Sequence, residues 1–361
     1  MGLSSVINDA VSFIHLTDDS RKRIASRLQP LREKHLQVCN EVSEDQLVLP
    51  VKETSLDCRI VGVDSGFVAK KLSNLDVLLV RAVGVVFDFE KSVLKKCSYV
   101  PGIYSFPTPR ISKAGLELDE VNCSNSLVRL REEINLAKKA IEEHSPKYCF
   151  LDGSVIPQYV DRPRPDSKIN EEYFSTIKAF EDLFEAAEKH NCFLLGCVED
   201  SRGKRFVDIL ENEVFANNGF SMQMENVFDS SLLDYFLHVG ERTFCFPYTK
   251  NASKHPVLKD FSEKWGNRIF SFYLKPAPLD RPLRVEFVSS PEKAVETANE
   301  IASVVFSLSH SHREYAYPSV LIEADLRARL HPQEIDTVYN KIIDKVAKKI
   351  NLRLRRDSRP F

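Results

Sequence analysis

Hydrophobic residues along the chain follow two rhythms, one typical of strands and one typical of helices. Short apolar runs rich in β-branched side chains predict strands at 59–63, 77–89, 92–99, 147–151 and 192–198. Segments with an apolar residue at every third or fourth position predict helices at 5–40, 124–143 and 171–189. The first three strands follow one another without a helix, so we expect antiparallel pairing, whereas each later helix brings the next strand in parallel.

The N-terminal segment reads as a helical arm with an expected break and cap at the Thr-Asp-Asp-Ser stretch 17–20. Its expected role is packing on the core, with dimerisation or partner contact as the alternative. The helix before the fourth strand is predicted to begin at a cap within 124–126 and to end near Glu143. Further elements are predicted as helices at 205–213, 230–239, 292–309, 318–330 and 334–350, and as strands at 242–247, 268–274 and 283–288.

These elements predict an α/β fold with a ribonuclease-H-like mixed sheet, in which three antiparallel strands are followed by parallel strands and helices flank the sheet. Actin-like ATPases share this order of elements, so the order alone does not choose between the two. The expected domains are an N-terminal helical arm (1–50), a main domain (55–330) with an inserted segment at about 215–290, and a C-terminal helix with a basic tail (331–361).

Charge and cysteine usage narrow the class of protein. The 361 residues include 50 basic and 52 acidic ones, and the formal net charge of -2 indicates no global attraction to nucleic acid or membrane. Such a partner must therefore contact a local patch. The eight cysteines form no Cys-x-x-Cys pair, which favours a reducing, intracellular setting and argues against a zinc site. No signal-like leader or membrane-length apolar run occurs, so we expect a soluble cytoplasmic protein.

Two of the predicted strands end on an aspartate. The run 59–63 stops at Asp64, where Ser65-Gly66 reads as a turn, and the run 147–151 stops at Asp152 before Gly153. Mg²⁺ and Mn²⁺ prefer oxygen ligands, and two such ions about 4 Å apart can hold the attacking and leaving oxygens of a phosphodiester. The two aspartates therefore predict a shared acidic cleft. The alternative is that each one forms a turn or caps a helix.

Two helices can supply further carboxylates. At 100° per residue, Glu133 lies on the flank of the buried stripe of its helix, whereas Glu132 points to the opposite side. Glu133 is therefore the candidate ligand, and an ion pair with Arg129 is its alternative role. In the helix that follows Pro318, Asp325 is expected partly toward the core. An ion pair with Arg329 is the alternative for Asp325.

Asp325 shares its helical face with Leu321 and Ala328. Glu323 lies about 160° away around the helix and is expected to be solvated. An aspartate in a helix interior is locally unfavourable and so invites a functional reason.

Basic residues offer candidate phosphate contacts. Arg162 and Arg164 follow Asp152 in a proline-rich loop and are predicted to contact a phosphate near the metal centre. The basic C-terminal tail, with Arg355 and Arg356, is either a phosphate-binding strip or a solvated tail.

Other catalytic classes find no support in the sequence. His310, His312 and His331 do not cluster and are expected to be surface or capping residues. The chain has no Ser/His/Asp arrangement, no Gly-x-Ser-x-Gly elbow and no P-loop.

The chain resembles the NurA nucleases, a family found mainly in archaea with a ribonuclease-H-like domain. The resemblance runs from about Arg59 to Phe361. It rests on an ordered set of short motifs, namely Val-Asp-Ser-Gly at 63–66, Leu-Arg-Glu-Glu at 130–133, Leu-Asp-Gly-Ser at 151–154, Gly-Glu-Arg at 240–242, Arg-Val-Glu at 284–286, Tyr-Pro at 317–318 and the closing Arg-Pro-Phe.

The resemblance implies that Asp64, Glu133 and Asp152 bind Mn²⁺ or Mg²⁺, with Tyr317 near the site. A late helical position that is often His in the family is Asp325 here, so either this carboxylate or a nearby His completes the metal site. An arginine expected two residues after the tyrosine is replaced by Ser319. The family further implies a homodimer around a DNA channel. The resemblance also implies action with a hexameric HerA-type ATPase in DNA end resection, during repair of double-strand breaks by homologous recombination.

The sequence therefore predicts a metal-dependent DNA exonuclease and single-strand endonuclease. Two metal ions on Asp64, Glu133, Asp152 and Asp325 would activate water for in-line attack. An actin-like ATPase is disfavoured, because such enzymes need a late glycine pair and none of the 12 glycines is adjacent to another. A non-catalytic ribonuclease-H-like scaffold that only binds DNA is the other alternative, since an acidic set is necessary for catalysis and not sufficient.

Overall fold

The computed structural model describes residues 3–72, 76–112, 115–215, 224 and 227–346. The chain forms two compact units that interleave along the sequence. Unit 1 comprises Met1–Thr54, Cys197–Asn251 and Asn267–Pro318, and unit 2 comprises Ser55–Gly196, Ala252–Gly266 and Ser319–Phe361. The domain boundaries expected from the sequence stay a prediction. None of the described helices combines the length and apolar character needed to cross a membrane.

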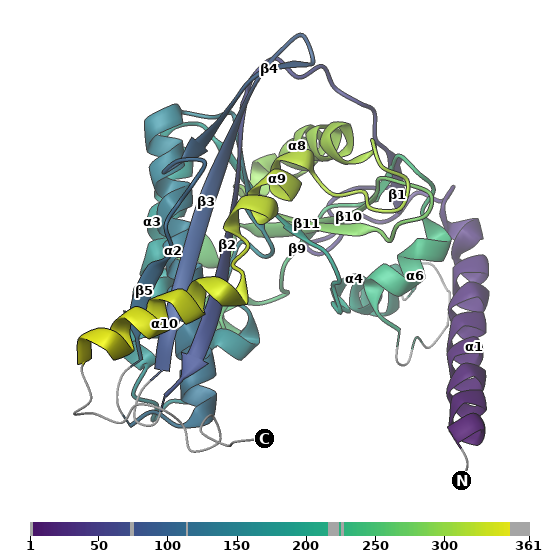
Figure 1. The fold of residues 1–361 in the computed structure, drawn as a ribbon. Coiled ribbons are helices and arrows are strands. Elements are labelled where there is room, and N and C mark those ends of the chain that lie inside the picture. The colour runs from purple at the N-terminus through teal and green to yellow at the C-terminus, as the bar shows by residue number, and fades with distance from the viewer. Residues whose placement is uncertain (1–2, 73–75, 113–114, 216–223, 225–226, 347–361) are drawn as a thin grey trace. The chain divides into compact units, whose positions relative to one another are not determined.

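Unit 2 contains the sheet that the sequence predicts (Figure 1). Its strands are β2 (Arg59–Lys71), β3 (Asp76–Glu90), β4 (Val93–Val100), β5 (Thr108–Ile111), β6 (Tyr148–Asp152) and β7 (Phe193–Val198), the last of which contains the boundary between the units. Their order is β7-β6-β2-β3-β4, with β5 on β3. β2, β3 and β4 pair antiparallel and β6 joins β2 in parallel, which confirms the expected ribonuclease-H-like mixed sheet. The short strand β5 lies where the sequence predicted only a link, and Pro109 is tolerated there because β5 pairs with β3 alone.

Helices cover both faces of this sheet. They are α2 (Leu118–His144), α3 (Asn170–Lys189), the short α7 (Glu263–Gly266), α9 (Ser319–Ala328) and α10 (Pro332–Val346). α2 begins at Leu118, six residues before the predicted cap, because Glu117 and Glu120 form a capping box with each other's backbone N–H groups. α9 lies against the face of β2 that carries Gly62 and Gly66, since a Cβ on either glycine would meet Val320 or Ala328. The predicted end of the last helix at 350 lies outside the described residues.

The predicted end of β2 at residue 63 is wrong. β2 runs through Asp64 and Ser65 to Lys71 and pairs with β3 over its whole length. Gly66 is needed for a close approach rather than a turn, because a Cβ there would lie 2.6 Å from the carbonyl oxygen of Ala328. The pairing of β2 with β6, in contrast, ends at Val63 and Leu151. One edge of β2 is therefore released by β6 just before Asp64.

Unit 1 contains a smaller antiparallel group of strands. They are β1 (Val48–Pro50), β8 (Glu241–Thr243), β9 (Phe246–Pro247), β10 (Ile269–Lys275) and β11 (Leu283–Val288). The order is β1-β8-β10-β11, and β9 pairs with β10, so the predicted strand 242–247 is split in two. The helices of this unit are α1 (Leu3–Leu28), α4 (Arg205–Ile209), α6 (Asp229–Phe236) and α8 (Ala294–Ser309).

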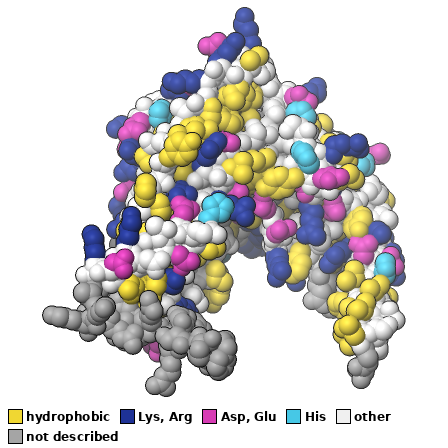
Figure 2. All heavy atoms as spheres, in the orientation of Figure 1, with side chains coloured by type: hydrophobic (Ala, Val, Ile, Leu, Met, Phe, Trp, Pro, Cys, Tyr) yellow, Lys and Arg dark blue, Asp and Glu magenta, His cyan; other side chains and the backbone are white. Residues whose placement is uncertain are grey.

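α1 is a continuous helix, so the break expected at 17–20 is wrong. The hydroxyl of Thr17 donates to the carbonyl oxygens of Phe13 and Ile14, and Asp18 pairs with Lys22 one turn later. Only the last turns of α1 are buried, through Ile24, Ala25 and Leu28. Hydrophobic side chains of its first half are exposed and gather over the free end of the helix (Figure 2).

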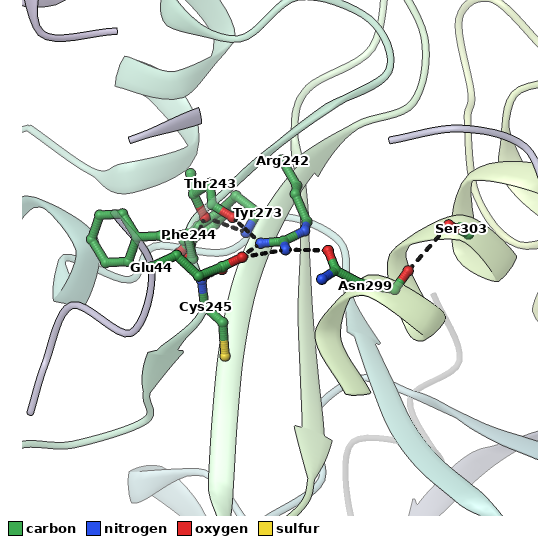
Figure 3. A network of polar contacts seen from close by, with 8 residues as sticks. All are labelled: Glu44, Arg242, Thr243, Phe244, Cys245, Tyr273, Asn299 and Ser303. Atoms are coloured by element: carbon green, nitrogen blue, oxygen red, sulfur yellow. Dashed lines mark hydrogen bonds and ion pairs between the residues drawn. The ribbon is translucent and has the colours of Figure 1, made fainter. Parts of the chain in front are cut away.

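A buried polar network joins three segments of unit 1 that are far apart in sequence (Figure 3). The guanidinium of Arg242 has no exposed surface and donates to both carboxylate oxygens of Glu44 at 2.7 Å. It also donates to Asn299 in α8, and the backbone N–H of Cys245 donates to Glu44. Arg242 therefore holds the segment that precedes β1 against β8 and α8.

Candidate active site

The two aspartates predicted at strand ends lie side by side, although only one of them ends a strand. Asp152 is the last residue of β6, and Val63 and Leu151, which precede Asp64 and Asp152, are paired in register. Gly153 follows with a positive φ of 110°, so the chain turns away at once. Because β6 ends here while β2 continues, side chains from neighbouring helices can reach the edge of β2.

Glu133 is buried on α2, as the helical wheel predicts. It is 2% exposed, and its Oε2 accepts hydrogen bonds from the hydroxyl of Ser65 and from Arg129 Nη1, the latter at 3.0 Å. The same arginine nitrogen lies 3.1 Å from the hydroxyl of Ser65. Glu133 therefore makes the ion pair considered as its alternative role. It makes this pair inside the acidic cluster, and Glu132 turns outward to Arg110.

Asp325 is exposed, so the expectation that it faces partly toward the core is wrong. The buried stripe of α9 is centred on Ala324, and residues 323 and 325 flank it on opposite sides. Glu323, expected to be solvated, is half-buried and accepts hydrogen bonds from the hydroxyl of Tyr99 and from Arg327, both at 2.8 Å. Asp325 forms no ion pair with Arg329 among the residues that the structure describes.

Electrostatics show that three of the predicted carboxyl groups act on the fourth, Asp64. Burial raises the pKa of Asp64 to about 8, and the negative charges of Glu133, Asp152 and Asp325 add to the rise. Burial likewise raises the pKa of Glu133 to about 7, while Arg129 and Ser65 oppose this and Asp152 reinforces it. The cluster is therefore an environment in which negative charge is costly unless a proton or a cation compensates it.

The donor set fits a hard divalent cation. Carboxylate oxygens from β2, α2, β6 and α9 are the ligands that Mg²⁺ and Mn²⁺ prefer, and their mutual repulsion would be relieved by a positive ion. Within the described part of the chain, no three Asp, Glu, His or Cys side chains already stand close enough to hold a metal. The carboxylates are thus gathered without forming a closed coordination shell.

The other predicted site residues lie in different surroundings. Tyr317 belongs to unit 1, where it is buried and its hydroxyl donates to the carbonyl oxygen of Cys197 at 2.9 Å. Arg162 pairs with Asp260 at 2.8 Å, and Arg164 pairs with carboxylates of the first turn of α2 and its cap. Arg355 and Arg356 lie outside the described residues.

Sequence reasoning missed the role of Ser65, which it took for part of a turn. Strand alternation carried past Asp64 would have placed Ser65 on the face opposite to Asp64, where α2 lies. Arg129 left a clear signal, since it precedes Glu133 by one helical turn. Together these two residues hold one oxygen of Glu133, and its Oε1 has no hydrogen-bond partner among the described residues.

Comparisons with known proteins agree with this architecture. The NurA domain model matches residues 58–330. The crystal structure of the NurA nuclease from Sulfolobus solfataricus is similar over 97% of this chain and 99% of its own, with 15% identity and a TM-score of 0.59. A crystal structure of NurA with manganese is similar over 96% of this chain and 99% of its own, with 12% identity and a TM-score of 0.54.

At such low identity the structural matches show the fold alone. No curated protein is significantly similar in sequence. The family model, however, spans well over half of the chain, and its match includes Asp64, Glu133, Asp152 and Asp325. The chain therefore belongs to the NurA family.

Proposed function

We propose that this protein is a metal-dependent nuclease that hydrolyses phosphodiester bonds of DNA, as an exonuclease and a single-strand endonuclease. The observation that carries the proposal is the cluster of four carboxyl groups from β2, α2, β6 and α9, in which burial, together with the charges of Glu133, Asp152 and Asp325, raises the pKa of Asp64 to about 8. A relative with the same fold is described as a nuclease, and this supports the same reaction class here.

The metal is proposed to be Mn²⁺ or Mg²⁺, held as two ions by Asp64, Glu133, Asp152 and Asp325. A NurA structure with manganese supports this choice. When bound, such ions supply Lewis-acid activation of the phosphodiester and of the attacking water.

The residues of the chain itself hold the ligands in place. Asp64 sits on a long paired strand, so its backbone position is rigid. Ser65 and Arg129 retain Oε2 of Glu133, which leaves Oε1 available as the ligand atom. Arg129 also supplies a positive charge beside the cluster, where a phosphate could meet it. The expectation that Tyr317 lies near the metal site rests on the resemblance alone.

The partners are also proposals. The family resemblance suggests single- and double-stranded DNA as substrate, a homodimer, and a HerA-type hexameric ATPase in end resection during double-strand-break repair. The exposed hydrophobic side chains of α1 provide a surface that a protein partner could cover. The mass of the protein in solution, measured by light scattering with and without such an ATPase, tests both assemblies.

The first test of the nuclease proposal is cleavage of end-labelled linear DNA with Mn²⁺, with Mg²⁺ and with EDTA. Asp64→Ala and Asp152→Ala are expected to abolish cleavage while the protein stays folded by circular dichroism. Glu132→Ala is the matched control, because Glu132 lies next to Glu133 on α2 but pairs outward with Arg110. Full activity in either aspartate variant would refute the site. Metal-independent binding without cleavage in the wild type would favour a DNA-binding scaffold instead.

A further inference from the structure

A cavity of about 420 Å³ in unit 1 is lined by arginines and aromatic residues. It is lined by residues of α1, of the loop at 200–203 and of the first turns of α6, together with Arg281. None of these residues belongs to the carboxylate cluster, which is part of unit 2. The cavity is large enough for a ligand of the size of a mononucleotide.

The charges of the cavity leave guanidinium groups unmatched. Of its three aspartates, Asp18 pairs with Lys22 at 2.8 Å and Asp234 pairs with Lys275. Asp200 lies 3.5 Å from Arg281, and both side chains are largely exposed, so this pair is weak. Arg21 and Arg202, the other two arginines, form no ion pair with any described residue. Asp18 and Asp234 are thus paired with lysines outside the lining, and Asp200 forms only a weak, exposed pair with one of the three lining arginines.

The loop that carries Arg202 is held in one conformation. The hydroxyl of Ser230 donates to the carbonyl oxygen of Ser201 at 2.8 Å, and the backbone N–H of Asp229 donates to Gly203 at 2.9 Å. A Cβ on Gly203 would lie 2.5 Å from Arg284 Nη1, so a larger residue here would require that guanidinium to shift. The buried Asp229 in turn accepts hydrogen bonds from two backbone N–H groups at the start of α4. Arg202 therefore lies on a loop whose backbone is hydrogen-bonded to the start of α6.

The remaining lining suits a phosphate ester. α6 begins after Phe228, whose side chain cannot accept a hydrogen bond, and its first-turn residues Ser230 and Ser231 line the cavity. Phe228 and Tyr235 line it as well, and an aromatic ring can stack on a nucleobase. A guanidinium group can donate two parallel hydrogen bonds to two oxygens of one phosphate, which a lysine ammonium group cannot do.

We propose that this cavity of unit 1 binds the phosphate group of a nucleotide or of a nucleic-acid strand, through Arg21, Arg202 and Arg281. The site goes beyond the proposed nuclease function, because it uses none of the carboxylates. It would hold a nucleotide product or a stretch of strand through residues of unit 1 that take no part in the proposed cleavage.

The test is equilibrium binding to the full chain in EDTA, where metal-dependent cleavage cannot occur. The probes are inorganic phosphate, dAMP and a fluorescent single-stranded oligonucleotide. Arg202→Ala combined with Arg281→Ala should weaken binding at least tenfold, and Arg21→Ala should weaken it severalfold. Arg202→Lys keeps the charge but cannot form two parallel hydrogen bonds to a phosphate. Its affinity should lie between those of the wild type and the double variant. Arg313→Ala is the matched control, since Arg313 is an exposed arginine of the same unit outside the cavity.

The pattern among the probes identifies the source of the phosphate. Equal affinity for phosphate and dAMP indicates a phosphate site, tighter dAMP binding indicates a nucleotide site, and tighter oligonucleotide binding indicates a strand. The proposal is overturned if no probe binds saturably, or if the double variant binds as tightly as Arg313→Ala. Asp64→Ala separates the two proposals, because it should lose cleavage and keep binding here.

Discussion

The hydroxyl group of Ser65 helps to fix the position of the Glu133 carboxylate. Ser65 donates to the same carboxylate oxygen that Arg129 contacts, and this oxygen is 3.0 Å from the arginine. A ligand whose second oxygen is anchored loses less freedom when the first oxygen binds a metal. The pair Ser65 and Arg129 should therefore matter for metal affinity, although neither is a proposed ligand.

Ser65→Ala is expected to weaken Mn²⁺ binding about tenfold, in line with the loss of an outer-shell partner at other metal sites. Isothermal titration with Mn²⁺ measures the change. Arg129→Gln should act in the same direction, and Glu132→Gln on the same helix should leave affinity unchanged. Mn²⁺ affinity that is equal in wild type and Ser65→Ala would show that the hydroxyl does not position Glu133.

The metal-free protein should lose stability as pH rises from about 4 to about 8. The folded pKa of Asp64 is about 8 against an ordinary value of 3.8, and that of Glu133 is about 7 against 4.5. In this window the folded state binds more protons than the unfolded state, so raising the pH favours unfolding. Melting temperatures in EDTA at several pH values should fall through the window. The fall should be smaller in Asp64→Asn, and an identical fall in both proteins would contradict the assignment.

Among single residues, the sequence indicated which carboxylates are candidates for the site, but it did not always indicate which way their side chains point. The pattern of apolar positions identified Glu133 rather than Glu132 as the buried glutamate, because helical geometry alone decides that choice. It could not place Asp325 and Glu323, since both flank the buried stripe of α9. Which flank is exposed depends on Tyr99 from β4, a contact that no local pattern encodes.

Among the elements, β2 differs most from its sequence pattern. Glycine after an apolar run predicts a turn, yet Gly66 lies in the middle of a strand because α9 approaches its backbone. Strands β3, β6, β7 and β11 were predicted within one or two residues, because their apolar runs are bounded by turn residues or helices. The start of α2 was missed because a glutamate provides its cap. β5 was missed because its proline reads as a link.

Gly66→Ala should destabilise the protein by about 1–3 kcal/mol, because the added methyl group would overlap the carbonyl oxygen of Ala328 and force α9 to shift. Urea denaturation measures the loss. Gly102→Ala is the matched control, since a Cβ at that position meets no atom within 4 Å. Equal free energies of unfolding for the two variants would show that α9 does not need glycine at position 66 in order to pack on β2.

At the scale of the whole molecule, contacts between segments far apart in sequence hold unit 1 together. Arg242 makes such contacts with Glu44 and Asn299, while its own Nε has no hydrogen-bond partner among the described residues. Buried ion pairs of this kind are sensitive to the loss of one member, because the other member is then left charged in an apolar setting. The carboxylate cluster lies in the other unit.

Arg242→Ala should lower the free energy of unfolding by about 3–5 kcal/mol, as expected when one partner of a buried ion pair is removed. Arg242→Met combined with Glu44→Gln should recover part of this loss, because the pair is then replaced on both sides. Chemical denaturation of Arg242→Met, of Glu44→Gln and of the double variant gives the coupling between the two residues. Strictly additive losses would argue against the network, and unchanged Mn²⁺ affinity is expected because no proposed ligand is involved.

The continuous pairing of β2 also affects how often the backbone around Asp64 opens. The strand is 13 residues long, pairs with β3 throughout and with β6 up to Val63, so the backbone at Asp64 cannot open without its neighbours. In hydrogen–deuterium exchange, the amides of β2 that precede Asp64, where the strand is paired with both β3 and β6, should be among the slowest of unit 2 and should exchange only on global unfolding. Any rearrangement that admits a substrate then belongs to side chains and to α9, while the strand beneath them keeps still.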